Sequence, residues 1–205
     1  MKMETVNHEK FRKYLDFSTP DNVYIMTAMT RKKDGSDFNT GSSDYRHPRL
    51  VKRLIIRNTK DYDECFRELE IIAEALWATF RIYITFNPRS LRKAYSHLMQ
   101  HTMKLLLENN TESFYTETSK FDSRFKSFLD KDSGKAKTKY HMLDVDCKEV
   151  PFDVINQHAE VVDVFPTKNG SHVLIKPTNP KSWEGLEDVE FKHDNLLLLK
   201  YKHFS

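Results

Sequence analysis

The stretch from Thr138 to Val150, TKYHMLDVDCKEV, decides the fold and sets two carboxylates inside an otherwise apolar run. Its bulky apolar residues predict a strand over 140–147. Successive side chains of a strand point to opposite faces, so Asp144 and Asp146 are expected to project together while the aliphatic residues beside them face the core. Because an unpaired buried charge is costly, the face with both carboxylates must meet water, a cation or a basic partner.

The composition is that of a soluble globular protein. The chain has 205 residues, which suffices for one substantial domain or two tightly joined subdomains, and 39% hydrophobic with 31% charged residues excludes a fibrous or wholly disordered chain. The formal net charge of +3 suits a polyanionic partner but does not demonstrate one. Any phosphate-binding surface must therefore come from local clusters of basic residues.

Cysteine usage and hydropathy indicate the compartment. The two cysteines, Cys65 and Cys147, belong to no CxxC or Cys/His cluster, so we expect no zinc site and no disulfide framework. The N-terminus has no apolar signal core, and no run of about 18 apolar residues occurs. These features predict a cytoplasmic protein with no membrane partner.

The first two thirds of the chain alternate between strand and helix patterns. Strands are expected over 21–30, 50–56 and 81–86, and the segment 31–48 is polar and loop-like. Helices are expected over 8–17, from Asp61 onward, after the Asn87-Pro88 turn, and over 113–130.

The last third changes to short β runs. Strands are expected over 140–147, 160–165, 172–176 and 196–201, with a brief helix over 151–158. This order predicts an α+β fold in which the last third forms an antiparallel sheet with a helix on one face, similar to an RNA-recognition-motif (RRM) sheet. We therefore expect an N-terminal α/β subdomain over 1–135 and an RRM-like subdomain over 136–205, joined in one compact core.

Three pieces of this last third could carry chemistry. The first is the pair Asp144 and Asp146, since two close carboxylates repel each other and a divalent cation such as magnesium or manganese is the usual reason to tolerate them. The alternative is the solvent-facing side of an ordinary strand.

The second piece is the turn in Asp163 to Pro177, DVFPTKNGSHVLIKP. Backbone N–H groups and the side chains of Thr167, Lys168, Ser171 and His172 could bind phosphate oxygens there. The alternative is a plain hairpin turn, which TKNG also suits.

The third piece is Phe191 to Tyr201, FKHDNLLLLKY, where Asp194 precedes an apolar strand. Such a residue can complete a metal site begun on a neighbouring strand, and the alternative is a turn aspartate. Basic residues at the start of the helix after Pro88, namely Arg89, Arg92 and Lys93, could bind a phosphate or a nucleic-acid backbone, or could simply form a solvated helix face.

Together these pieces resemble the archaeo-eukaryotic primase superfamily, the primase-polymerases. That family carries an aliphatic strand with DxD or DxE, an Sxxx(G)xH-like element, and an apolar strand preceded by one acidic residue. The corresponding stretches, in the same order, are LDVD (143–146), TKNGSH (167–172) and HDNLLLL (193–199). Two departures are that Ser171 is adjacent to His172 and that Thr167 stands where the family has its leading Ser.

The resemblance implies a two-subdomain catalytic core and template-directed nucleotidyl transfer from NTP or dNTP, with two Mg²⁺ or Mn²⁺ ions and a DNA template and primer as partners. A separate helicase and a role in the replication of a phage or other mobile element follow by analogy. The implied metal ligands are Asp144, Asp146 and Asp194, with Asp188 or Glu190 as alternatives for the third. The implied nucleotide contacts are Thr167, Lys168, Ser171, His172 and Lys200.

Two other functions remain open from the sequence. A DxD pair with a nearby His also suits a metal-dependent nuclease or other phosphohydrolase. A non-catalytic DNA-binding replication accessory would carry the same basic clusters without turnover.

Overall fold

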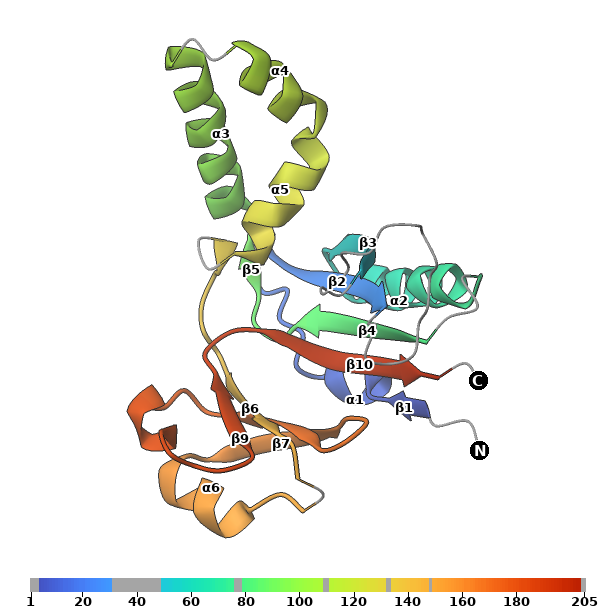
Figure 1. Cartoon of the computed structure of the whole chain (residues 1–205), viewed down its shortest axis with the longest axis vertical. Helices are drawn as coiled ribbons and strands as arrows, with labels where there is room; N and C mark the ends of the chain where they lie inside the picture. Colours follow the sequence, from blue (N-terminus) through green and yellow to red (C-terminus); the bar gives the residue numbers. More distant parts are fainter. Residues whose placement is uncertain are drawn as a thin grey trace, which may run out of the picture.

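The computed structural model of the chain describes residues 4–30, 49–75, 79–108, 111–131, 134–147 and 149–203. These residues form two antiparallel sheets, a long helix that covers one of them, and an arm of three helices (Figure 1). The predicted α+β class is confirmed. The polar segment predicted as a loop over 31–48 lies outside the described residues.

The first sheet has the strand order β1-β10-β4-β2-β3, with β5 paired to β2. Its strands are β1 (Glu4–Val6), β2 (Asn22–Thr30), β3 (Arg49–Ile56), β4 (Phe80–Thr85), β5 (Arg89–Ser90) and β10 (Leu196–Lys202). Helix α2 (Thr59–Ala75) packs its apolar stripe, including Tyr62, Phe66 and Leu69, into one core with Met26 and Ile84 of the sheet. The strands predicted here and the helix from Asp61 onward are confirmed, and α1 (His8–Arg12) is shorter than predicted.

The second sheet has the order β7-β8-β6-β9. It consists of β6 (His141–Val145), β7 (Val161–Pro166), β8 (Ser171–Ile175) and β9 (Val189–Lys192), with α6 (Phe152–His158) and the 3₁₀ helix η3 (Pro180–Trp183). Alternation divides its side chains between two cores. Leu143 and Val173 pack with Ile155 of α6, whereas Met142 and Leu174 belong to the core shared with the first sheet.

The strand predicted over 196–201 exists but joins the other sheet. As β10 it lies between β1 and β4, and the unpredicted β9 takes the edge of the second sheet instead. The reason is that the run from Leu197 to Tyr201 is buried throughout, which requires cover on both faces. The end of the chain therefore crosses back over the boundary proposed at residue 136.

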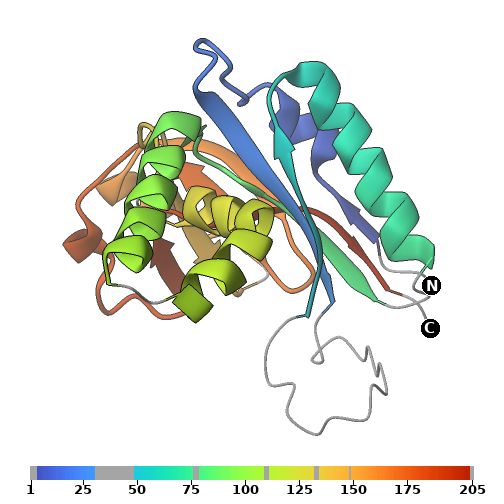
Figure 2. The ribbon, with the colours of Figure 1, turned by 90° about the horizontal axis from the view of Figure 1, so that it is seen from above.

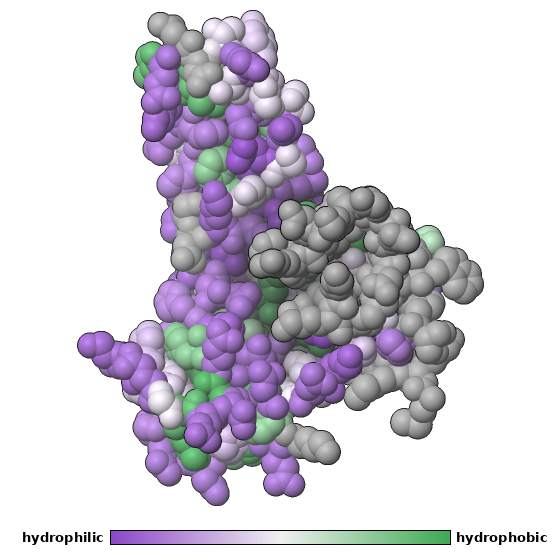
Figure 3. Space-filling model, viewed as in Figure 1, coloured by the Kyte–Doolittle hydropathy of each residue, from purple (hydrophilic) through white to green (hydrophobic). Residues whose placement is uncertain are grey.

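The arm consists of α3 (Leu91–Leu107), α4 (Thr111–Ser119) and α5 (Phe121–Asp130) and extends away from both sheets (Figure 1). Its base is anchored where Ala94 and Leu129 pack on Val23 and Ile25 of β2. Figure 2 shows the arm and α2 on opposite sides of the first sheet, and Figure 3 shows a mainly hydrophilic arm surface. The helical prediction for 113–130 is confirmed, with a break at Lys120.

Gly170 closes the β7–β8 turn where the turn touches the end of β6. A Cβ atom on Gly170 would lie 1.9 Å from the Val145 carbonyl oxygen and 3.1 Å from the Asp146 Cα. We therefore expect Gly170→Ala to lower the free energy of unfolding by about 3 kcal/mol, measured by urea denaturation. The control is Gly185→Ala, which has φ +82° and no described atom within 4 Å of the new Cβ, and should cost about 1 kcal/mol from backbone strain alone. Equal losses would contradict the steric argument.

Candidate functional site

Asp144 lies near the end of β6 and has one polar neighbour on each adjacent strand. It stands directly opposite His172 on β8 and Glu190 on β9. Residues directly opposite each other in an antiparallel ladder project from the same face, so these three side chains are grouped. The His172 Nε2 lies 3.5 Å from the Asp144 Oδ1. The Asp144 side chain is 33% exposed and that of Glu190 is 68% exposed, so both carboxylates can reach a ligand from solvent.

Asp146 follows β6 by one residue and is exposed. Its N–H donates to the Asp188 carbonyl oxygen at 2.9 Å, which continues the β6–β9 pairing one step past the strand. Alternation then turns Asp146 to the same face as Asp144. Asp188 itself has φ 58°, a left-handed conformation that is uncommon for a non-glycine residue, and this bends the chain as it enters β9.

Cationic side chains surround this face. Lys192 forms an ion pair with Glu190, two residues before it on β9. From the first sheet, the Arg81 guanidinium lies 5.2 Å from the centre of the Tyr201 ring, and from the β7–β8 turn the Lys168 Nζ lies 5.3 Å from the same ring. We call this group the inter-sheet site: Asp144, Asp146, Lys168, His172, Glu190 and Lys192 with Arg81 and Tyr201.

The sequence patterns predict neither Arg81 nor Lys192 nor Tyr201 as part of the site. The alternation in Val-Glu-Phe-Lys (189–192) is the one signal that could have identified β9 and set Glu190 and Lys192 on a common face. Arg81 and Tyr201 lie within apolar strands of the first sheet, and only the packing of the sheets brings them here.

His172 is held as a neutral hydrogen-bond donor. Its Nδ1 accepts a hydrogen bond from the Leu198 N–H at 3.2 Å. Burial, together with the positive charges of Arg81 and Lys192, lowers the pKa of His172 to about 4. A neutral imidazole whose Nδ1 accepts carries its proton on Nε2, the nitrogen that faces Asp144. His172 is thus suited to donate to a carboxylate or phosphate oxygen rather than to bind a metal.

The structure does not bring Asp194 to the other carboxylates. The Asp194 Oδ2 forms an ion pair with Arg89 at 2.7 Å, and both side chains are almost fully buried. Asn87 donates to the Asp194 Oδ1 at 3.3 Å and to the carbonyl oxygen of Tyr140, which directly precedes β6. Asp194 therefore lies level with Tyr140, four residues or about 13 Å along the strand from Asp144. The structure thus pairs the predicted third ligand, Asp194, with Arg89, and it is Glu190, one of the two alternatives, that stands opposite Asp144.

Three predicted nucleotide contacts are also engaged elsewhere. Lys200 is buried and its Nζ pairs with Glu70 of α2 at 2.5 Å, on the face of the first sheet away from Tyr201. Ser171 stands opposite Val145 and so shares the face that α6 covers. The Thr167 hydroxyl accepts from the Gly170 N–H at 3.1 Å and closes the turn. Among the predicted contacts, His172 is the one that stands against Asp144, and Lys168 lies over the ring of Tyr201.

The start of α3 does not offer a phosphate site. Asp21 accepts from the Arg92 N–H at 2.7 Å, and Ser90 accepts from the Lys93 N–H at 3.1 Å, so a carboxylate and a hydroxyl already cap the helix. Arg89 is buried in its ion pair, and the Lys93 Nζ donates to the Lys135 carbonyl oxygen at 2.9 Å. Of the three predicted nucleic-acid contacts, Arg92 is the one whose exposed side chain no described hydrogen bond or ion pair engages.

The inter-sheet site fits a divalent cation that arrives with a phosphate-bearing ligand. Within 4–30, 49–75, 79–108, 111–131, 134–147 and 149–203, no three His, Cys, Asp or Glu side chains are arranged to hold a metal ion by themselves. Magnesium, however, is usually bound by one or two carboxylates together with substrate phosphates rather than by a protein cage. Asp144 and Glu190 stand opposite each other on β6 and β9, with Asp146 after the end of β6, and these three carboxylates would be the donors for such a cation.

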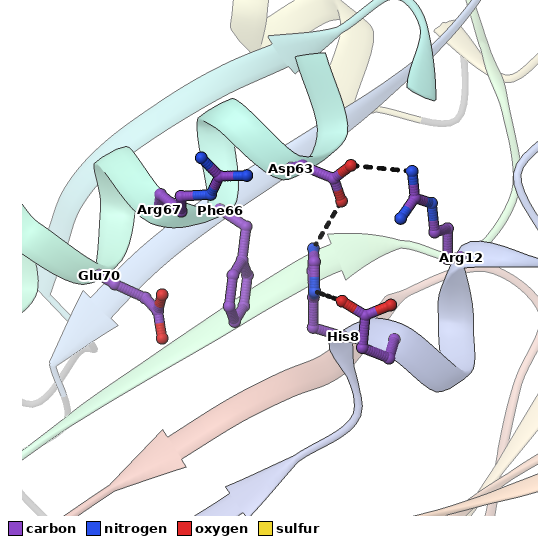
Figure 4. A pocket seen from close by; sticks show the side chains of 7 residues that line it. His8, Arg12, Asp63, Phe66, Arg67 and Glu70 are labelled. Atoms are coloured by element: carbon purple, nitrogen blue, oxygen red, sulfur yellow. Dashed lines mark ion pairs between the residues drawn. The ribbon is translucent and has the colours of Figure 1, made fainter. Parts of the chain in front are cut away.

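A cavity of about 290 Å³ lies between α1 and α2 (Figure 4). The His8 ring stacks on Phe66 with 3.9 Å between ring centres, and Arg12 pairs with Asp63 at 2.9 Å. Burial lowers the pKa of His8 although the neighbouring carboxylates oppose this. Three carboxylates of the cavity are already paired: Glu9 with His8, Asp63 with His8 and Arg12, and Glu70 with Lys200 of β10. The lining of the cavity is His8, Glu9, Arg12, Asp63, Phe66, Arg67 and Glu70.

Comparison of the chain with protein-family models, with curated proteins and with solved structures gives no match. Among the helices that the structure describes, none is long and apolar enough to cross a membrane.

The lowered pKa of His172 makes stability depend on pH in a defined window. Below pH 6.5 the unfolded chain protonates this His, whereas the folded chain does so only near pH 4, so the free energy of unfolding falls as pH falls from about 6.5 to 4. Burial also lowers the pKa of His141 to about 4, so His141 contributes to the pH dependence in the same direction. In His172→Asn, which keeps an acceptor for the Leu198 N–H, we expect the free energy of unfolding to change less between pH 7, 6 and 5 than in the wild type, as measured by urea denaturation. The same dependence on pH in both proteins would contradict the lowered pKa of His172.

Substitutions of Asp194 and Glu190, the two candidates for the third metal-binding carboxylate, should differ in their effect on stability. Asp194→Asn removes the partner of a buried guanidinium and should lower the free energy of unfolding by about 3 to 5 kcal/mol. Glu190→Gln changes an exposed side chain and should alter it by less than about 0.5 kcal/mol. Urea denaturation of both variants measures the difference. An Asp194→Asn variant as stable as the wild type would contradict a structural role for Asp194, and Asp194 would again be a candidate metal ligand.

Proposed function

We propose that the chain is a nucleotidyltransferase of the primase-polymerase type, which extends a DNA primer on a template from NTP or dNTP. The observation that carries the proposal is the grouping of Asp144, Glu190 and a neutral His172 on one sheet face, with Arg81 from the first sheet and Lys168 from the β7–β8 turn both at the ring of Tyr201. Carboxylates beside cations are what phosphoryl transfer requires, since it depends on positioning and charge neutralisation.

The topology of the second sheet supports the same proposal. The order β7-β8-β6-β9 puts the first and third strands of the sheet at its centre, and α6 connects the first two strands. This is the arrangement of an RRM-like sheet, which the family resemblance implies, with η3 where that motif has its second helix. The DxD pair lies on a central strand of it, next to His172.

Each side chain has a role in this reaction. Asp144, Asp146 and Glu190 would hold Mg²⁺ or Mn²⁺, which when bound lowers the pKa of the primer 3′-hydroxyl and neutralises the triphosphate. The Nε2–H of His172 donates to a phosphate oxygen or orients Asp144. Lys168, Lys192 and Arg81 offset the negative charge of the triphosphate. The 3′-oxygen bonds to the α-phosphorus, pyrophosphate leaves, and the hydroxyl proton passes to water.

The DNA template and primer are the proposed macromolecular ligands, and a separate helicase remains an expectation by analogy. Arg92, exposed at the base of the arm, is the remaining candidate of the predicted α3 cluster for contact with the nucleic-acid backbone.

The test is primer extension with Mn²⁺ or Mg²⁺ and all four nucleotides. We expect product from the wild type and a loss of about 100-fold or more in Asp144→Ala and in Glu190→Gln. The matched control is Asp153→Asn, which changes an exposed carboxylate of the same subdomain on α6, beyond the opposite face of the sheet, and should retain full activity.

Other outcomes would overturn the proposal in favour of a stated alternative. Degradation of a labelled oligonucleotide without added nucleotide would identify a nuclease or phosphohydrolase. Salt-sensitive DNA binding without nucleotide incorporation, and without a thermal shift on addition of dNTP and Mn²⁺, would identify a DNA-binding accessory.

A further inference from the structure

Strand β10 contains a bulge beside the inter-sheet site. Leu198 pairs with Tyr83 of β4, and the next paired residue is Lys200 with Ile82, so Leu199 is an extra residue. A bulge interrupts the ladder and lets backbone groups turn to other partners. Both polar groups of Leu198 do so, because its N–H donates to the His172 Nδ1 at 3.2 Å and its carbonyl oxygen accepts from the Asn7 Nδ2 at 2.8 Å.

Asn7 connects this bulge to the second sheet. Its side chain is buried, and the two hydrogens of its amide go to different strands: one to Leu198 of β10 and one to the Pro166 carbonyl oxygen of β7 at 2.9 Å. Its own N–H donates to the Leu199 carbonyl oxygen at 2.6 Å. One residue between β1 and α1 thus holds three backbone carbonyl groups in place.

These contacts restrain His172 from two directions. Leu198 presents the N–H that the imidazole Nδ1 accepts. Pro166 stands directly opposite Ser171, so the restraint on Pro166 also fixes the strand position from which His172 projects. Only a side chain with two amide hydrogens at this length satisfies both carbonyl groups. Ala would leave two buried acceptors unpaired, and Asp would place a carboxylate against them.

We propose that Asn7 is a positioning residue that fixes the Leu198 peptide, so that His172 accepts at Nδ1 and directs its Nε2–H at Asp144 and at a phosphate bound there. The use of that N–H on a nucleotide rests on the proposed function. The restraint on the imidazole does not, and it can be measured in the protein without any substrate.

The first measurement is a ¹⁵N NMR spectrum of the histidine ring nitrogens in the full chain at neutral pH, with His172 assigned by comparison with His172→Asn. In the wild type we expect a single tautomer, with an unprotonated Nδ1 and a protonated Nε2. In Asn7→Ala the Leu198 N–H is no longer held at the imidazole, so the Nδ1 signal should move toward that of a mixture of both tautomers. An unchanged tautomer in folded Asn7→Ala, or a protonated Nδ1 in the wild type, would overturn the proposal.

The control for general loss of stability is Asn87→Ala. Asn87 is also fully buried and bridges backbone groups, donating to the Tyr140 carbonyl oxygen at 2.9 Å and accepting from the Lys139 N–H at 2.8 Å, and no described hydrogen bond joins it to Leu198 or His172. We expect Asn87→Ala to be destabilised with the His172 tautomer unchanged. A tautomer shift of equal size in both variants would assign the effect to loosening of the fold and would overturn the role of Asn7.

The second measurement is primer extension, in which Asn7→Ala should lower kcat by about 10- to 100-fold, with the KM for the DNA unchanged. If the wild type makes no product, the proposed function fails, while the NMR tautomer measurement still decides whether Asn7 restrains His172. If the wild type is active, an unchanged kcat in Asn7→Ala with a changed His172 tautomer would show that the restraint has no part in the reaction and would overturn the proposal.

Discussion

Burial of both faces of β10 is the constraint on which the rest of the structure depends. On one face of the strand Leu197 and Leu199 belong to the core beneath α2, on the other Leu198 and Tyr201 pack with Tyr83 of β4, and the strand lies between β1 and β4. Because it follows β9 directly in the chain, it ties the end of the second sheet to the middle of the first. The inter-sheet site exists only because this strand brings Leu198 to His172 and Tyr201 to Lys168.

The buried ion pair of Arg89 and Asp194 joins the remaining parts. Arg89 belongs to β5, its guanidinium also donates to the Lys131 carbonyl oxygen after α5, and Asp194 leads into β10. A buried ion pair contributes little net stability compared with apolar packing, yet each of its two charges requires the other at a fixed position. We infer that it specifies how the arm and the two sheets are joined, with Asn87 satisfying the backbone of the segment between them.

Local patterns predicted the elements well, because periodicity reports which face of each element is buried. They predicted the strand of Asp144 and the helix of Tyr62. They could not assign the role of Asp194, because a single acidic residue before a strand gives the same sequence pattern whether it binds a metal or pairs with Arg89. They also could not place Asn7, whose partner Leu198 lies 191 residues away and is reached through backbone groups that any residue has.

The charges around Asp144 explain why a neutral His172 belongs in the inter-sheet site. The carboxylates of Asp144 and Glu190 stand on β6 and β9, Lys192 pairs with Glu190 on β9, and Arg81 comes from the first sheet. A cation with its phosphate ligand placed between them would meet negative charge on one side and positive charge on the other. A protonated imidazole beside Asp144 would neutralise a carboxylate that the cation needs. Burial keeps His172 uncharged, so under the proposed function it would orient that carboxylate without competing for its charge with a cation bound there.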